Sequence, residues 1–193
     1  MLSVIVATHE SERTLVPTLS ALVPGAMSGL ITEVVVADAG SKDATAEVAD
    51  IAGCRYLASE APLGPRLTDA ARSTRTPWLM FLRAGIVLDA DWTRASETFM
   101  QAASFSDTAP RAAVFRASGN ASAQPGLGDL LALARAVFAG RKPAPDQGLV
   151  ISRDLYEATG GHPAKADPEA ALLGRLGRKV VLLGASARRL RYP

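Results

Sequence analysis

Glu33-Val-Val-Val-Ala-Asp-Ala-Gly-Ser-Lys-Asp-Ala-Thr45 joins a predicted strand to a predicted helix. The apolar, β-branched run predicts a strand over Val34–Ala37 that ends at Asp38, and the turn residues Gly40 and Ser41 follow it. In an open α/β sheet, ligands bind at the carboxyl ends of the strands. Asp38 is therefore a candidate ligand-binding residue. An equal alternative is that Asp38 and Ser41 only cap the helix that follows.

Strands and helices alternate along the rest of the chain. Strands are predicted over Leu2–Ala7, Arg55–Leu57, Trp78–Leu82, Ala112–Arg116, Leu149–Ser152 and Val180–Leu183. Helices are predicted around Leu15–Leu22 and over Ala44–Ala52, Leu67–Arg75, Asp91–Ala103, Asp129–Phe138, Arg153–Thr159 and Pro168–Leu176. This alternation predicts an α/β fold with a layered, largely parallel sheet.

Composition indicates one domain without a nucleic-acid partner. The 193 residues are 48% hydrophobic, which is enough for a sizeable core. The net charge of +2 gives no reason to expect DNA or RNA binding. Cys54 is the only cysteine, so neither an internal disulfide nor a cysteine metal cluster can form.

We recognise neither a signal peptide nor a membrane-spanning stretch, and we predict a cytoplasmic protein. Arginines near the end of the chain leave peripheral membrane contact through a basic tail open, with a solvated terminus as the other explanation. These arginines are Arg175, Arg178, Arg188, Arg189 and Arg191.

The common phosphate-binding and nucleophile motifs are absent from the sequence. There is no Gly-x-Gly-x-x-Gly after the first strand, no Gly-x-x-x-x-Gly-Lys-Ser/Thr and no Gly-x-Ser-x-Gly. Instead, three segments stand at the carboxyl ends of predicted strands, and all three should line one crevice. They are Thr8–Glu10, Asp38–Ser41 and Arg83–Gly85.

The sequence resembles the family 2 glycosyltransferases of the GT-A fold, in a small bacterial subgroup. Leu2–Glu10, Glu33–Thr45 and Trp78–Leu82 are similar to the opening signatures of that family, and similarity continues in Gly64–Arg66, Asp146–Pro163 and Ser186–Arg189. The resemblance implies one GT-A-like domain over residues 1–193, a three-layer sandwich around a mostly parallel central sheet. Residues 1–85 would form a nucleotide-binding half, and residues 86–193 an acceptor half with the basic tail.

The resemblance implies a nucleotide-diphosphate sugar, UDP- or GDP-linked, as the donor. Asp38, with Gly40 beside it, stands where the family contacts the base, and Thr8, His9 and Glu10 stand where the family lies along base and ribose. A carboxylate can accept a hydrogen bond from uracil, and an imidazole can stack on a base. We prefer base contact for His9 over a solvated loop position.

Two further positions correspond to the phosphate side of the family's donor site. Arg66 stands where the family often carries an arginine that faces the phosphates, and Asp69 stands where a polar residue often lies. A surface cation on a helix is an equal explanation for Arg66.

The sequence departs from the family where a metal would bind. The family follows the strand at Trp78–Leu82 with Asp-x-Asp, which holds a divalent cation, but this chain has Arg83-Ala84-Gly85. The loss of both carboxylates argues against Mg²⁺ or Mn²⁺ at this place, and we predict that Arg83 supplies the positive charge instead. Asp89-Ala90-Asp91 also reads Asp-x-Asp, but we expect it to begin a helix.

The family's inverting mechanism uses a carboxylate as general base, in a Glu-Asp pair. Asp167 corresponds to the Asp of that pair, and Ala166 replaces the Glu. Asp167 is equally a helix cap before Pro168. Asp146-Gln147 is a second candidate on the acceptor side, and we interpret His162 as a loop residue.

The resemblance predicts a glycosyltransferase that uses a nucleotide-diphosphate sugar and inverts the anomeric centre if it is active. The missing metal motif and the missing Glu favour a second hypothesis, a catalytically inactive module that binds a nucleotide or another protein. A nucleotidyltransferase is a weaker third hypothesis, because no glycine-rich phosphate loop follows Ala7.

Overall fold

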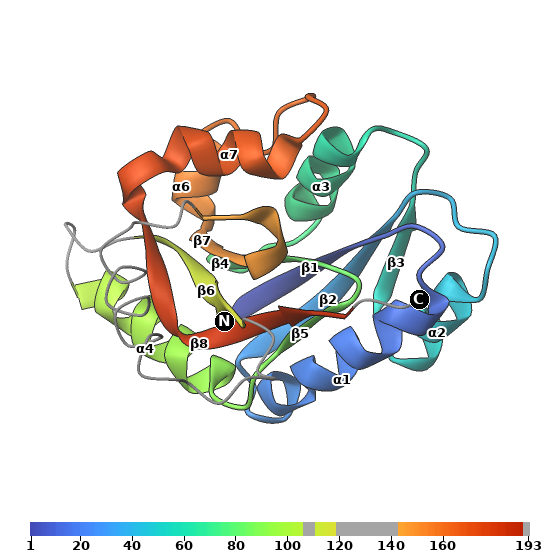
Figure 1. Ribbon diagram of the computed structural model, residues 1–193, viewed down its shortest axis with the longest axis horizontal. Coiled ribbons are helices and arrows are strands. Elements are labelled where there is room, and N and C mark those ends of the chain that lie inside the picture. Colours follow the sequence, from blue (N-terminus) through green and yellow to red (C-terminus); the bar gives the residue numbers. More distant parts are fainter. Residues whose placement is uncertain (106–110, 119–142, 191–193) are drawn as a thin grey trace, which may run out of the picture.

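A computed structural model describes residues 1–105, 111–118 and 143–190 (Figure 1). The strands are β1 (Leu2–Thr8), β2 (Ile31–Asp38), β3 (Arg55–Ala58), β4 (Trp78–Arg83), β5 (Ile86–Leu88), β6 (Ala112–Ala117), β7 (Leu149–Ser152) and β8 (Val180–Arg189). The helices are α1 (Glu12–Met27), α2 (Thr45–Ile51), α3 (Leu63–Arg72), α4 (Trp92–Phe105), α6 (Arg153–Ala158) and α7 (Pro168–Leu176), with short 3-10 turns over Pro145–Gln147 and Gly177–Lys179.

The eight strands form one curled sheet in the order β3-β2-β1-β4-β7-β6-β8-β5. Strands β3, β2, β1 and β4 pair in parallel. Strand β7 is antiparallel to both β4 and β6, while β8 runs parallel to β6 and antiparallel to β5. The predicted parallel sheet is therefore found in the first half of the chain, and the second half makes the sheet mixed.

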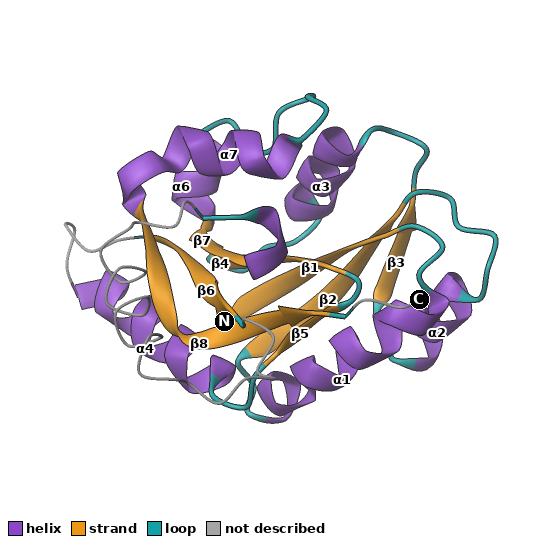
Figure 2. Cartoon of the chain, viewed as in Figure 1, coloured by secondary structure: helices purple, strands orange, loops and turns teal. Residues whose placement is uncertain are grey.

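Helices cover both faces of the sheet, which confirms the three-layer α/β prediction (Figure 2). Helices α1, α2 and α4 lie on one face, and α3, α6 and α7 lie on the other. Strand β1 shows how the sequence serves both layers, because Val4 and Val6 pack with the first group and Ile5 and Ala7 with the second. Fully burying a Val or Ile side chain contributes about 1.5–3 kcal/mol, so both faces stabilise the central strands.

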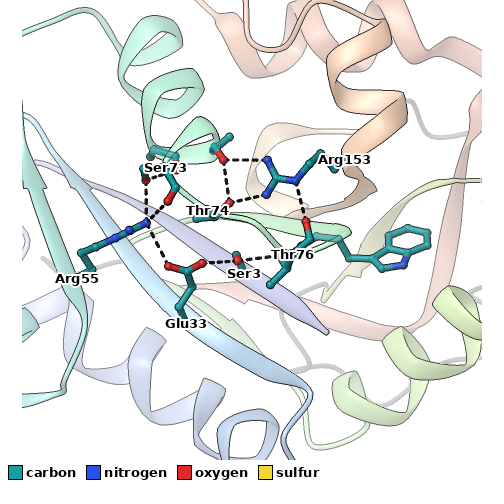
Figure 3. Close-up of polar contacts among 10 residues, drawn as sticks. Ser3, Glu33, Arg55, Ser73, Thr74, Thr76 and Arg153 are labelled. Carbon is teal, nitrogen blue, oxygen red and sulfur yellow. Dashed lines mark hydrogen bonds and ion pairs between the residues drawn. The ribbon is translucent and has the colours of Figure 1, made fainter.

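The first strands are also joined at their amino ends by a network of polar side chains (Figure 3). Glu33 accepts a hydrogen bond from Ser3 at 2.9 Å and forms an ion pair with Arg55 at 3.1 Å. The hydroxyl of Thr76 lies 2.8 Å from that of Ser3, and Arg153 donates to the Thr76 carbonyl at 2.8 Å. Because Arg153 begins α6, this network ties the second half of the chain to the strands of the first half.

The structure corrects several boundaries. The last strand was predicted to end at Leu183, but β8 continues to Arg189, so Ser186–Arg189 pairs with β5 and β6 and is not a tail. Strand β5 was not predicted. The helix predicted over 129–138 and Arg191 lie outside the described residues. Within the described ranges, no helix has the length and apolar character needed to cross a membrane.

Asp89 explains part of the β8 extension. Its carboxylate accepts hydrogen bonds from the backbone N–H and the hydroxyl of Ser186, at 2.6 and 2.8 Å. Asp91 pairs with Arg94 within the first turn of α4, at 2.7 Å. Asp89 also accepts a hydrogen bond from the Asp91 N–H at 3.1 Å, just before α4 as expected, so its contact with β8 is an additional role that was not predicted.

Candidate nucleotide-binding edge and its buried ion pair

The register of the parallel strands brings the three predicted segments to one edge of the sheet. Thr8 lies opposite Asp38 in the β1–β2 pair, and Ala7 lies opposite Arg83 in the β1–β4 pair. The carboxyl ends of β1, β2 and β4 therefore meet, as a ligand crevice requires. We refer to this place as the carboxyl edge.

Asp38 is the most heavily hydrogen-bonded side chain of the carboxyl edge. Its Oδ1 accepts from the hydroxyls of Thr8 and Ser41, at 2.7 and 2.6 Å. Its Oδ2 accepts from the backbone N–H groups of Gly40 and Ser41, at 2.8 and 2.6 Å, and from the hydroxyl of Tyr56 at 2.8 Å. Asp38 is fully buried. These five donors exceed the roughly four lone-pair sites of a carboxylate.

This environment keeps Asp38 charged. Burial raises the pKa of its carboxyl, but the hydrogen bonds from Ser41, Thr8 and Tyr56 outweigh burial and lower the pKa to about 2. Burial and the bond to Asp38 raise the pKa of the Tyr56 phenol to about 12. The carboxylate thus organises the turn after β2, and a nucleotide base could contact it only by displacing one of the present donors.

The loops after β1 and β2 hold each other in place. The Glu10 N–H donates to the Ser41 hydroxyl at 2.8 Å, and the Lys42 N–H donates to the Glu10 carboxylate at 2.8 Å. Glu10 has a φ of 48°, in the left-handed region that side chains seldom adopt. His9 is exposed beside these two hydrogen bonds, so its ring is accessible to a ligand. Glu10 therefore has a structural role, which is to join these two loops.

Arg66 and Asp69, both on α3, differ in their surroundings. The Nε of Arg66 is buried and makes no hydrogen bond within the described residues. Burial lowers the pKa of Arg66, and the charge of Asp38 opposes this, which places the guanidinium near the edge. Asp69 is exposed and pairs only weakly with Arg72, at 3.7 Å. An unpaired buried donor suits an anionic ligand, so Arg66 is a stronger candidate for phosphate binding than Asp69 is for a donor contact.

Arg83 forms an ion pair with Glu169, the second residue of α7. Both Nε and Nη2 of Arg83 donate to Oε2 of Glu169, the Nε at 2.5 Å. The Glu169 side chain is only 8% exposed, whereas that of Arg83 is 36% exposed. Burial raises the pKa of the Glu169 carboxyl, and Arg83 only partly offsets this. The carboxyl edge thus contains a half-buried cation beside a buried carboxylate.

Asp167 has a different role from Glu169. Its side chain accepts a hydrogen bond from the Ala170 N–H at 3.0 Å, so it is the N-cap of α7, which is one of its two predicted roles. Sequence reasoning missed Glu169. Its signal was helical spacing, because Glu169 precedes Leu172, Leu173 and Leu176 by three, four and seven residues and so shares their buried face.

His162 is a loop residue, as predicted, but it is buried, with 4% exposure. Its Nδ1 lies 2.9 Å from the Tyr156 hydroxyl, and its ring meets Phe81 edge-on at 4.6 Å between centroids. Gly64 allows this loop to approach α3, since a Cβ there would lie 2.2 Å from the Pro163 carbonyl oxygen. Burial lowers the pKa of His162 to about 4, so the ring is neutral at pH 7.

The donor groups at the carboxyl edge do not fit a divalent cation. Arg83-Ala84-Gly85 offers no carboxylate, and the nearby carboxylate of Glu169 is already paired with Arg83. Within the described ranges, no group of three or more His, Cys, Asp or Glu side chains could hold a metal ion. Asp146, the other acceptor-side candidate, is exposed, and its neighbour Gln147 is buried and bonded to the Phe115 carbonyl at 2.8 Å.

Solved structures of two other proteins have the same fold. TarS 1-349 from S. aureus matches with a TM-score of 0.72 and 15% identity, over 97% of this chain and 60% of that one. TarS has also been solved with UDP-GlcNAc and with UDP. Glucosyl-3-phosphoglycerate synthase from Mycobacterium tuberculosis, in complex with Mn²⁺, UDP and glucosyl-3-phosphoglycerate, matches with a TM-score of 0.66 and 19% identity, over 100% of this chain and 73% of that one.

The present chain thus spans about 60% of the length of the TarS structure. A search of curated protein sequences finds no match. The model of the family described as glycosyl transferase family 2 matches residues 3–114, which is more than half of the chain. This match and the GT-A fold show that the chain belongs to glycosyl transferase family 2.

Proposed function

We propose that the protein transfers a sugar from a nucleotide diphosphate, with a UDP-sugar as the first donor to test. The observation that carries the proposal is the Arg83–Glu169 pair at the carboxyl edge. This pair places a cation that can bind the leaving diphosphate next to a buried carboxylate that can accept the proton of the acceptor hydroxyl. Family membership supports the reaction class, and the UDP and UDP-GlcNAc complexes of TarS support the choice of nucleotide.

The donor is proposed to lie across the ends of β1, β2 and β4. The base contacts the exposed ring of His9 and the turn after β2 that Asp38 organises. Thr8 and Glu10, at the end of β1, hold this turn in place through their hydrogen bonds with Asp38 and Lys42. Arg66 and Arg83 pair with the diphosphate, because a guanidinium can donate two parallel hydrogen bonds to phosphate oxygens. No step of this proposal passes through a metal ion.

Phosphate binding by Arg83 would release the Glu169 carboxylate. Glu169, whose pKa burial raises, then takes the proton of the acceptor hydroxyl as that oxygen attacks the anomeric carbon. The bond from the anomeric carbon to the diphosphate oxygen breaks, the nucleoside diphosphate leaves, and the configuration inverts. Asp167, the base predicted from the sequence, is the alternative for the same step.

The test measures nucleotide release from a panel of UDP- and GDP-sugars, with water as the acceptor. We expect Glu169→Gln to lower turnover about 100-fold or more, the usual contribution of a general base. Asp167→Asn, the matched variant, should keep both turnover and stability, because Asn caps a helix about as well as Asp does. The reverse pattern would assign the base to Asp167.

The same experiment distinguishes the transferase from an inactive module. A nucleotide that raises the melting temperature without any sugar release would favour the module. No stabilisation by any nucleotide would contradict the proposal as a whole.

A further inference from the structure

A small cavity lies between the His162 loop and α7. Six of the residues that line it are Phe81, Gly148, Leu149, His162, Glu169 and Leu173. It leaves about 10 Å³ for the centre of a water-sized sphere, which is about the room that one water molecule needs. A sugar or a nucleotide cannot enter such a space. Its lining includes the Glu169 carboxylate, which is the proposed base, and His162, a buried histidine to which the proposed transfer gives no role.

His162 presents one unpaired nitrogen to its surroundings. Its Nε2 is buried and makes no hydrogen bond to any described residue. The Tyr156 oxygen accepts a hydrogen bond from the backbone N–H of His162 at 3.3 Å, and the Tyr156 proton has its nearest acceptor in His162 Nδ1, at 2.9 Å. We therefore assign the neutral ring's proton to Nε2, which makes this nitrogen a donor.

Glu169 has one oxygen outside its ion pair. Both contacts from Arg83 go to Oε2, so Oε1 is left for a second donor. No direct hydrogen bond joins Glu169 to His162, although both line the cavity. A water needs two to four polar partners, and a carboxylate oxygen with an imidazole N–H supplies two of them.

We propose that His162 is a positioning residue for Glu169, acting through one water molecule that is held in this cavity between His162 Nε2–H and Glu169 Oε1. The inference rests on the proposed function for its catalytic meaning, but the hydrogen-bonded chain can be tested without turnover. Tyr156 donates to Nδ1 of His162 and so keeps the ring proton on Nε2, where it can donate to the water.

The hydrogen bonds from His162 through the water to Glu169 keep the Glu169 carboxylate ionised and oriented when Arg83 binds the diphosphate. The other charged groups that act on Glu169 are Arg83 from β4, Asp167 from the start of α7 and Arg189 from β8. Asp167 favours the protonated form, and the two arginines favour the ionised form. With Arg83 engaged by substrate, a donor from His162 replaces part of the lost stabilisation.

The test measures the pKa of the Glu169 carboxyl by NMR, in protein labelled with ¹³C at the glutamate carboxyl groups. The Glu169 signal is assigned by its loss in Glu169→Gln. We expect His162→Phe to raise the Glu169 pKa by about one unit, because the donor is lost while the contact with Phe81 is kept. His162→Gln should restore most of the shift, since its amide nitrogen can occupy the place of Nε2.

An unchanged Glu169 pKa in His162→Phe would overturn the inference, as would failure of His162→Gln to restore it while both variants remain folded. If the wild type turns over a donor, the acid limb of its turnover profile should shift upward by the same unit in His162→Phe, with KM for the donor unchanged. A pKa shift in a protein with no turnover supports the His162–Glu169 chain and contradicts the proposed function, so the two failures are distinct.

Discussion

Removing the charge of Arg83 should destabilise the protein in a way that depends on pH. In Arg83→Met the buried carboxylate of Glu169 loses the partner that offsets its burial. Truncating one side of a buried pair costs about 3–5 kcal/mol, mostly through the charge left behind. Because the Arg83 side chain is 36% exposed, solvent screening reduces this, and we expect about 1–3 kcal/mol at pH 7.

The sign of the pH dependence follows from Glu169. Burial already raises its pKa, and the loss of Arg83 raises that pKa further. A carboxyl with a raised pKa in the folded state binds its proton more tightly there, so its contribution is favourable at low pH and is lost as pH rises. The loss of unfolding free energy caused by Arg83→Met should therefore be small near pH 4.5 and increase toward pH 7.

A double-mutant cycle in urea measures this coupling. Glu169→Gln in the Arg83→Met background should remove the pH-dependent part, and the coupling at pH 7 should be about 1–3 kcal/mol. The exposed Arg94–Asp91 pair is the matched control, and its cycle should give less than about 0.5 kcal/mol. A coupling at pH 7 no larger than the control, or an equal defect at both pH values, would refute the reasoning.

Three further predictions concern the residues around this pair. Asp38→Asn should cost about 2 kcal/mol above pH 4 in urea unfolding, because only the folded state lowers the Asp38 pKa to about 2. It should also reduce the wild type's loss of stability between about pH 4 and pH 2 by the same amount, and an unaltered acid profile would contradict this. The wild type should lose about 3 kcal/mol of stability as pH falls from about 6.5 to about 4, because burial lowers the His162 pKa to about 4 and the unfolded chain takes up the proton first. His162→Phe should remove this loss, and parallel stability profiles for wild type and variant would count against the prediction. Gly64→Ala should lower the melting temperature by several degrees, because the new Cβ would lie 2.2 Å from the Pro163 carbonyl oxygen, whereas Gly174→Ala, with nothing within 4 Å, should not.

Local sequence patterns predicted the elements that depend on local signals. The strand over Leu149–Ser152 and the helix over Pro168–Leu176 have the predicted bounds, since apolar runs and a proline after Asp167 mark them. The strand that ends at Asp38 is also confirmed, although it begins three residues earlier than predicted. Strand β5 was missed because its three residues gain their partners only from β8, about a hundred residues away.

The carboxyl edge was predicted from strand ends, but the ion pair between Arg83 and Glu169 was not. The partner of Arg83 lies 86 residues away, and no local pattern indicates which acid will reach it. A short motif indicated Asp167, which caps α7. The helical spacing of Glu169 with Leu172 and Leu173 indicates that Glu169 is buried, as it is. His162 looked like a loop residue because the packing of Phe81 and Tyr156 around it is tertiary.

The most direct test of the central claim is a calorimetric titration of UDP into the protein with chelator present. We propose that Arg83 provides the positive charge that a metal provides elsewhere in the family, so binding should persist in chelator and weaken about 10- to 100-fold in Arg83→Ala. The exposed Arg94→Ala variant, which removes the same charge elsewhere, should bind like the wild type. Binding that requires a divalent cation, or that is the same in Arg83→Ala, would contradict the account.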